Sequence, residues 1–330
     1  MLGRAGVGPV LAAVLLAGAM VGSLAACSAA GDPGSDPAPT GPTATSEPPR
    51  PTTVVQPTQD PQTARLTALA RLAEQAAAEL PTRRTAQPRT GEVLGADVSW
   101  PQCPRGMGIP ERRTLGSPMP LPTAEFVVLG LTNGPGFTAN PCLADQVRWV
   151  EDRRLLAAAY AVVSLPDAAA VAEHRTDGPY DGTTRLGSLA NAGYQQALAN
   201  VVTMRRAGLA TPVVWVDVEP VPDFDWSSDT AANGAVVEGA VRGYRYAGYR
   251  VGIYSTPALW AGVVGDLALG LPEWRAAGQT SRDEARDRCG DDWSIQGGPA
   301  VLGQWVEDAR DQDITCPGTS ARLGRWFQQY

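Results

Sequence analysis

Eight short apolar segments recur between residues 92 and 315, and helical patterns separate several of them. Strand, helix, strand in regular order is typical of a parallel sheet, and eight strands close a barrel. Gly208 follows the second helical pattern, as expected of a helix cap. The expected helices cover 143–153, 190–207 and 229–247, and the expected strands cover 92–100, 125–131, 156–165, 213–220, 252–255, 272–276, 300–306 and 313–315.

The later connections differ from the early ones. Residues 280–292 are charged and have weak apolar periodicity, so they are predicted to form a loop. Only about five crossover helices can be counted. The predicted fold class is therefore α/β, a TIM-like β/α barrel over residues 92–330 with about five crossover helices and three poorly covered final strands.

The strand at 213–220 carries a pair of acids. Its period-two pattern places three valines on one face, and Trp215, Asp217 and Glu219 on the other. Burial of two carboxylates costs free energy unless they are hydrogen-bonded, paired or used in chemistry. The pattern therefore indicates an acid pair at the mouth of a barrel, with an ion-pair network or a solvated strand end as the alternative.

Charge and composition exclude several classes of function. The formal net charge is -7 and the pI is near 4.9, which argues against a nucleic-acid partner. All 27 basic residues are arginines, so a Schiff-base or P-loop lysine is excluded. His174 is the only histidine, which disfavours a Ser-His-Asp triad and a histidine-rich metal site. No metal and no cofactor are expected.

The amino-terminal quarter, residues 1–81, is predicted to lie outside the folded domain. Arg4 precedes a short apolar run, and Leu24-Ala25-Ala26-Cys27 resembles the bacterial lipobox, so residues 1–26 are predicted to be a lipoprotein signal peptide. Cleavage before Cys27 would leave Cys27 to carry lipid and to anchor the chain to the outer face of the cell membrane. An ordinary cleaved signal peptide is the alternative. Residues 27–62 are predicted to be a disordered Pro/Thr-rich tether, and residues 63–81 a helical stalk or brace.

Four further cysteines suggest two disulfides in an exported protein, and three pairings are formally possible. The pairing of Cys103 with Cys142 and of Cys289 with Cys316 is favoured because each pair would connect nearby loops.

Four short motifs recur at or near the ends of the expected strands. They are Gly95-Ala96-Asp97-Val98-Ser99-Trp100, Trp215-Val216-Asp217-Val218-Glu219, Val251-Gly252-Ile253-Tyr254-Ser255 and Gln304-Trp305. In this order they resemble the motifs of glycoside hydrolase family 25, the Chalaropsis-type lysozymes. The likeness covers roughly residues 92–318, and its opening is similar to that of secreted actinobacterial proteins with a family-25-like domain.

The resemblance implies hydrolysis of the β-1,4 link between N-acetylmuramic acid and N-acetylglucosamine in peptidoglycan. It implies that Glu219 is the general acid and that Asp217 orients the substrate's acetamido group, the internal nucleophile. Asp97 would line the same cleft. Asp313 is the chosen last-strand acid, with Asp311 and Asp308 as fallbacks.

Several side chains near strand ends are candidates for sugar binding, because aromatic rings can stack on sugars. The candidates are Trp100, Tyr254, Trp274, Trp305 and Gln304. The loop with Pro101, Cys103 and Pro104 departs from the family pattern, which leaves a non-catalytic glycan-binding lipoprotein as the alternative function. A barrel enzyme acting on a small extracellular sugar has no motif of its own.

Overall fold

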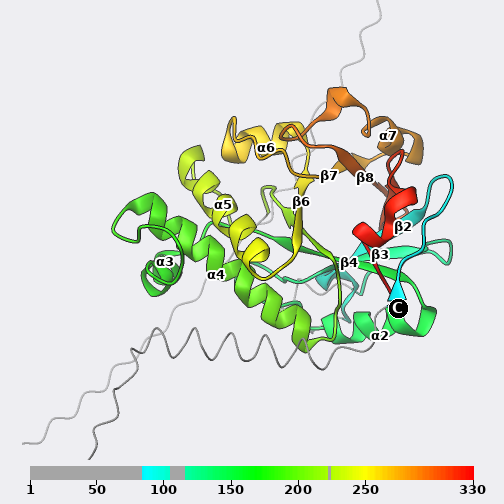
Figure 1. Ribbon diagram of the computed structural model, residues 1–330, viewed down its shortest axis with the longest axis horizontal. Helices are drawn as coiled ribbons and strands as arrows, with labels where there is room; N and C mark the ends of the chain where they lie inside the picture. Colours follow the sequence, from blue (N-terminus) through cyan, green and yellow to red (C-terminus); the bar gives the residue numbers. More distant parts are fainter. Residues whose placement is uncertain (1–83, 105–115, 222–223) are drawn as a thin grey trace, which may run out of the picture. The chain divides into compact units, whose positions relative to one another are not determined.

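The computed structural model describes residues 84–104, 116–221 and 224–330 (Figure 1). The expected signal peptide, the expected lipidation site Cys27, the expected tether and the expected stalk lie outside the described residues. Within the described ranges, no helix combines the length and apolarity needed to cross a bilayer.

Eight strands form a closed barrel, because β4 pairs with both β3 and β5 while the remaining strands pair around the ring. Each of the eight expected strands is present. Four of them lie within two residues of both predicted ends, and β4, β5, β7 and β9 each differ by three residues at one end. In ring order the strands are β2 (Leu94–Val98), β3 (Phe126–Gly130), β4 (Leu156–Val162), β5 (Val213–Asp217), β6 (Arg250–Ser255), β7 (Glu273–Gln279), β8 (Ala300–Glu307) and β9 (Arg310–Thr315).

The last strand corrects the expectation of a wholly parallel sheet. β9 pairs antiparallel with both β8 and β2, whereas the other ring pairings are parallel. Only Asp308 and Ala309 separate β8 from β9, and both have positive φ, as a type I′ hairpin turn requires. A parallel connection needs a dozen residues or more, so this short link forces a hairpin. The amino end of β9 therefore lies at the barrel mouth.

Five of the ring connections carry α-helices, as predicted, and side-chain caps start most of them. Thr184, Asp229, Thr256 and Ser281 each accept a hydrogen bond from the first turn of the helix that follows. α4 and α5 pack side by side on one flank (Figure 1). The helices are α2 (Leu143–Arg153), α3 (Ala168–His174), α4 (Arg185–Arg206), α5 (Thr230–Tyr246), α6 (Pro257–Val264) and α7 (Arg282–Asp287).

The stretch predicted as a charged loop contains α7 and the 3₁₀ helix η3 (Asp291–Trp293), which is a correction. α7 contributes only Ala285 to a small cluster with Trp305 and Ile314, so the cover over the final strands is thin, as expected.

Large aromatic side chains fill the inside of the barrel. Trp215 and Trp274 are completely or almost completely buried there, with ring centroids 6.1 Å apart. Space for Trp215 comes from the neighbouring strand, because a Cβ on Gly252 would lie 2.2 Å from its ring. The carboxyl-terminal segment closes the base. η4 (Ser320–Arg325) and β10 (Gln328–Gln329) place Trp326 and Phe327 against this inner core, and β10 pairs with β4 and with β1 (Arg84–Thr85).

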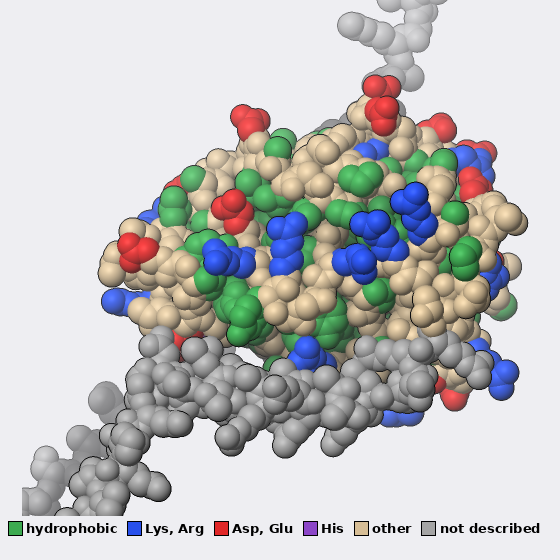
Figure 2. Space-filling model, viewed as in Figure 1, with side chains coloured by type: hydrophobic (Ala, Val, Ile, Leu, Met, Phe, Trp, Pro, Cys, Tyr) green, Lys and Arg blue, Asp and Glu red, His purple; other side chains and the backbone are tan. Residues whose placement is uncertain are grey.

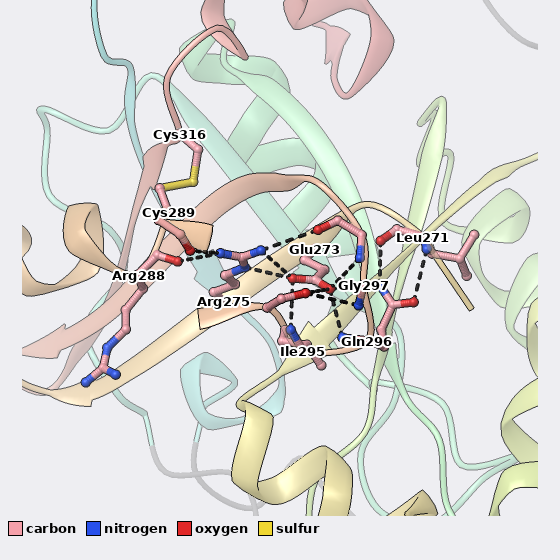
Figure 3. A network of polar contacts seen from close by, with 12 residues as sticks. Leu271, Glu273, Arg275, Arg288, Cys289, Ile295, Gln296, Gly297 and Cys316 are labelled. Atoms are coloured by element: carbon pink, nitrogen blue, oxygen red, sulfur yellow. Dashed lines mark hydrogen bonds and ion pairs between the residues drawn. A yellow bond between two sulfur atoms is a disulfide. The ribbon is translucent and has the colours of Figure 1, made fainter. Parts of the chain in front are cut away.

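A buried ion pair holds the outside of β7 to the loop before β8 (Figure 3). The side chains of Glu273 and Arg275 are 0% and 4% exposed, and their charged groups lie 2.7 Å apart. Glu273 also accepts hydrogen bonds from the backbone N–H groups of residues 295, 296 and 298, while Arg275 donates to the carbonyls of residues 288 and 290. An ion pair and hydrogen bonds thus fix the loop before β8 to β7, where few apolar side chains from helices cover the sheet.

Two disulfides connect Cys103 with Cys142 and Cys289 with Cys316, which confirms the favoured pairing. The first ties the loop after β2 to the start of α2, and the second ties the end of the α7 region to the segment after β9.

Figure 2 shows one face of the molecule, on which arginine side chains gather in a band and acidic side chains lie mostly near the edges. On this face the two signs of charge are therefore largely separate.

Candidate active site

The inner face of β5 presents Asp217, and Glu219 follows two residues later at the mouth. Backbone bonds secure this segment, since Val163 N donates to the Asp217 carbonyl (3.0 Å) and Val218 N donates to the Tyr254 carbonyl (3.1 Å). The Trp226 indole donates to the Glu219 carbonyl at 3.0 Å. These hydrogen bonds hold the strand ends in place. The charge of Glu219 contributes to the raised pKa of Asp217, which is consistent with the predicted alternation that places both carboxyls on one face of β5.

Five carboxyl groups from three strands converge on this end of the barrel. In the register of β2 and β9, Gly95 lies opposite Asp313, which brings Asp311 to the level of Asp97. Asp313 is completely buried, Asp97 and Asp217 are 6% and 3% exposed, and Glu219 and Asp311 are partly exposed. The acids thus form layers from the core to the mouth.

Hydrogen bonds order the lower layers. The Tyr254 hydroxyl donates to Gln304 Oε1 (2.7 Å), and Gln304 Nε2 donates to Asp97 Oδ2 (2.7 Å). Trp274 Nε1 donates to Asp313 Oδ1 at 2.8 Å. By contrast, Asp217 Oδ1 and Asp313 Oδ2 are buried and accept no hydrogen bond from the described residues. The arrangement therefore leaves acceptor capacity inside the acid cluster.

None of the five carboxyls forms an ion pair with a described arginine. Burial is the main cause that raises the pKa of Asp97, Asp217 and Asp313 well above their ordinary values, and neighbouring acids raise them further. A cluster of this kind holds protons at pH values where isolated carboxyls are ionised.

Glu219 is the acid best suited to proton transfer. Burial, and then the negative charge of Asp311, raise the pKa of Glu219 to about 7. The pKa of Asp311 is itself raised by burial. A carboxylic acid with a pKa near neutrality and partial exposure can be protonated before reaction and can release its proton during it.

The predicted sugar-binding residues occupy different places. Trp100 lies half-buried at the start of the 3₁₀ helix η1 (Trp100–Gln102), directly after β2. Tyr254 and Gln304 lie inside the barrel next to Asp97, and Trp274 lies deeper, beneath the acids. Trp305 is a correction: it is 3% exposed on the outer face of the sheet, packed against Ala285 and Ile314, and so does not join the acids.

Two further residues belong to the site. Tyr160 packs edge-on against Trp274, and the acids Asp97 and Asp217 contribute to the rise in its pKa after burial. Asp311, the fallback to Asp313 in the sequence, is the partly exposed acid of β9, and Asp313 lies beneath it. The sequence feature that points to Asp311 is the two-residue Asp308-Ala309 link. A link this short reverses the chain, so the amino end of β9, which carries Asp311, lies at the mouth. Asp308 lies exposed in that turn.

Among the described residues, no group of three or more His, Cys, Asp or Glu has an arrangement that could hold a metal ion.

Sequence comparisons support a lysozyme-like domain in this chain. A family model described as "Lysozyme-like protein 1" matches residues 184–287, a range that includes Asp217 and Glu219. A Dictyostelium discoideum protein named "Probable GH family 25 lysozyme 4" is 35% identical over 66 residues, which is 19% of this chain. The aligned stretch spans 30% of that relative.

Solved structures with a similar course of the chain include the catalytic domain of the endolysin ply40 from bacteriophage P40 of Listeria monocytogenes, with a TM-score of 0.44 and 13% identity. That likeness covers 72% of this chain and 99% of the endolysin domain. A family GH25 lysozyme from Aspergillus fumigatus has a TM-score of 0.41 and 16% identity, covering 71% and 99% of the two chains. The barrel assignment itself follows from the strand pairings.

Proposed function

We propose that this chain, whose barrel is lysozyme-like and of the glycoside hydrolase family 25 type, hydrolyses the β-1,4 link between N-acetylmuramic acid and N-acetylglucosamine in peptidoglycan. The observation that carries the proposal is Glu219, a partly exposed acid with a pKa of about 7 within a cluster of carboxyls that no described arginine neutralises. Glycoside hydrolysis needs such an acid to protonate the leaving oxygen.

Glu219 donates its proton to the glycosidic oxygen as the bond to the anomeric carbon breaks. The acetamido oxygen of the same sugar attacks that carbon, and a water molecule later opens the resulting ring and returns a proton to Glu219. Asp217 orients the acetamido group. Its Oδ1 accepts no hydrogen bond from the described residues, and the charge of Glu219 contributes to the raised pKa of its carboxyl.

Asp311, rather than Asp313, is the β9 acid that acts on the reaction. Asp311 is partly exposed and its charge raises the pKa of Glu219, while Asp313 is completely buried and hydrogen-bonded to Trp274. Asp97 has a supporting role. Gln304 donates a hydrogen bond to its carboxyl, and Tyr254 donates a hydrogen bond to Gln304. Trp100 remains a candidate for contact with sugar because it is half-buried beside the mouth.

The proposed site of action is the outer face of the cell membrane, and two features support it. The lipobox-like Leu24-Ala25-Ala26-Cys27 supports lipidation of Cys27 and tethering to the outer face of the membrane. The two disulfides support an oxidising compartment outside the cytoplasm.

The test compares the wild type with Glu219→Gln on purified peptidoglycan, measuring released reducing ends. The substitution keeps the shape of the side chain but removes its titrating proton, so turnover should fall by at least 100-fold, the order of a general-acid contribution. Asp308→Asn is the matched control, because Asp308 is exposed in the β8–β9 turn. A Glu219→Gln protein that kept full activity would contradict the assignment. A wild type that co-sediments with peptidoglycan without releasing reducing ends would indicate the non-catalytic binding protein instead.

A further inference from the structure

An exposed aromatic ring stands on the barrel rim in an unfavourable backbone conformation. Phe137 is 37% exposed and has a φ of 72°, in the left-handed region that non-glycine residues rarely adopt. It lies in the rim hairpin, which we define as residues 131–140, directly after β3. Backbone bonds from Asn133 N to the Thr138 carbonyl and from Thr138 N to the Pro135 carbonyl shape this hairpin.

The ring of Phe137 is stacked on the only histidine of the chain. The centroids of Phe137 and His174 lie 5.0 Å apart with an interplanar angle of 29°. His174 ends α3, in the connection after β4, and its Nδ1 lies 3.4 Å from Asp177 Oδ2. The connections that follow two neighbouring strands, β3 and β4, thus contribute one ring each to a shared platform at the mouth end of the barrel.

Contacts connect this platform to the acid cluster. Gly136 N donates to Ser164 Oγ at 2.7 Å, and the next residue back, Val163, donates its N–H to the Asp217 carbonyl. Gln196 supports the hairpin from α4, because its Nε2 donates to the Ser164 carbonyl and a Cβ on Gly136 would lie 2.3 Å from it. The position of Phe137 is therefore set by the same strand ends that set Asp217.

The hairpin also contains a buried amide without a partner. The side chain of Asn133 is 1% exposed, and neither its Oδ1 nor its Nδ2 has a hydrogen-bond partner in the described part of the chain. Such a group costs free energy, and a hairpin built only for stability would also favour glycine at residue 137. Strain and an unsatisfied amide in one loop are typical of a segment that serves binding.

We propose that Phe137 and His174 form a saccharide subsite that stacks on the apolar face of an N-acetylated sugar ring in a β-1,4-linked glycan, at a distance from the bond that is cleaved. This subsite rests on the proposed function for the identity of the glycan. Its contribution comes from stacking, so it adds to affinity and does not take part in proton transfer.

The first experiment uses the single histidine as a probe. The full chain with Glu219→Gln is labelled at histidine, and the imidazole signals of His174 are followed by NMR during titration with soluble, uncross-linked peptidoglycan glycan strands. The His174 signals should shift in proportion to bound glycan. Binding that saturates by calorimetry while those signals stay unmoved would overturn the proposal.

The second experiment separates binding from a merely structural role. In the same Glu219→Gln background, Phe137→Gly removes the ring and suits the positive φ, so thermal stability should be unchanged or higher while glycan affinity falls about two- to tenfold. Phe137→Trp should keep the affinity, and Tyr246→Ala is the control because Tyr246 is 74% exposed at the end of α5. Unchanged affinity in Phe137→Gly would contradict the subsite.

The two proposals fail in different ways. A wild type that binds glycan with a His174 shift but releases no reducing ends would remove the hydrolase and leave the subsite. If the wild type cleaves peptidoglycan while the Phe137→Gly variant binds glycan with unchanged affinity, the subsite is contradicted and the hydrolase remains.

Discussion

Glu219 has a raised pKa for two separable reasons. Burial disfavours its ionised form, and the charge of Asp311 disfavours it further. Burial is a property of the strand end and cannot be removed by a single polar substitution, whereas the charge belongs to one side chain. The two causes can therefore be tested independently.

The pH dependence of the reaction follows from the raised pKa of Glu219, to which both causes contribute. A general acid works only when protonated, so kcat/KM on peptidoglycan should decline above about pH 7, approaching tenfold for each further pH unit. The measurement is a pH–rate profile on soluble glycan strands at constant ionic strength. Activity that continued to rise to pH 9 would exclude Glu219 as the acid.

Asp311→Asn tests the second cause. The substitution removes a negative charge that raises the pKa of Glu219, so the alkaline limb of the pH–rate profile should move to lower pH. Asp308→Asn removes the same charge from an exposed position in the neighbouring turn and should leave the limb in place. Equal shifts in both variants would mean that net charge, and not the position of Asp311, controls the acid.

Folding stability should record the same raised pKa. Because folding raises the pKa of Glu219 from 4.5 to about 7, its ionisation favours the unfolded state, and the free energy of unfolding falls as pH rises between these values. Glu219→Gln removes that penalty. Chemical unfolding should show the variant about 1–3 kcal/mol more stable than the wild type at pH 8, with the difference vanishing near pH 4. A constant difference across this range would contradict the raised pKa.

At the scale of single side chains, the period-two pattern of β5 predicted the inner face correctly, since Trp215 and Asp217 both lie inside the barrel. In β8 the same rule separates two neighbours: Gln304 faces Asp97 inside the barrel, so Trp305 faces outward. Asp311 could not be preferred from its residue type, because its exposure depends on the direction of β9.

At the scale of elements, strand order was predictable because each strand has a distinct apolar run, and the helices α2, α4 and α5 have clear caps or periodicity. The direction of β9 depended on the length of one link. α7 was missed because six residues are too few for an apolar stripe, and only Ala285 in it is buried. Long-range polar contacts hold α7 in place instead, and such contacts leave no local pattern in the sequence.

The buried Glu273–Arg275 ion pair predicts a large effect of one substitution on folding stability. Arg275→Met leaves the completely buried Glu273 without its cation, so the free energy of unfolding should fall by about 3–5 kcal/mol. Urea unfolding followed by tryptophan fluorescence measures the change. Arg185→Gln is the matched control, because its pair with Asp229 is exposed and should contribute less than about 1 kcal/mol. Similar losses in the two variants would show that burial of the Glu273–Arg275 pair has no special role.

At the scale of the whole molecule, the barrel has two ends with opposite chemistry. The mouth contains carboxyls that destabilise one another, and the base is filled by apolar side chains from the last residues of the chain. Trp326 lies 6.0 Å from Trp215 and Phe327 lies 4.5 Å from Phe126, between ring centroids. Packing at the base thus offsets the cost of the acids at the mouth.

Phe327→Ala tests this division. The side chain is 1% exposed, so its truncation should lower the free energy of unfolding by about 3–5 kcal/mol. The base lies at the opposite ends of the strands from Glu219, so the variant should retain the alkaline limb of its pH–rate profile when assayed well below its melting temperature. Tyr246→Ala, an exposed aromatic on α5, should change stability by less than about 0.5 kcal/mol. Should Phe327→Ala shift the pH limb as much as Asp311→Asn does, the acids would depend on the base, and stability and catalysis would not be separable along the barrel axis.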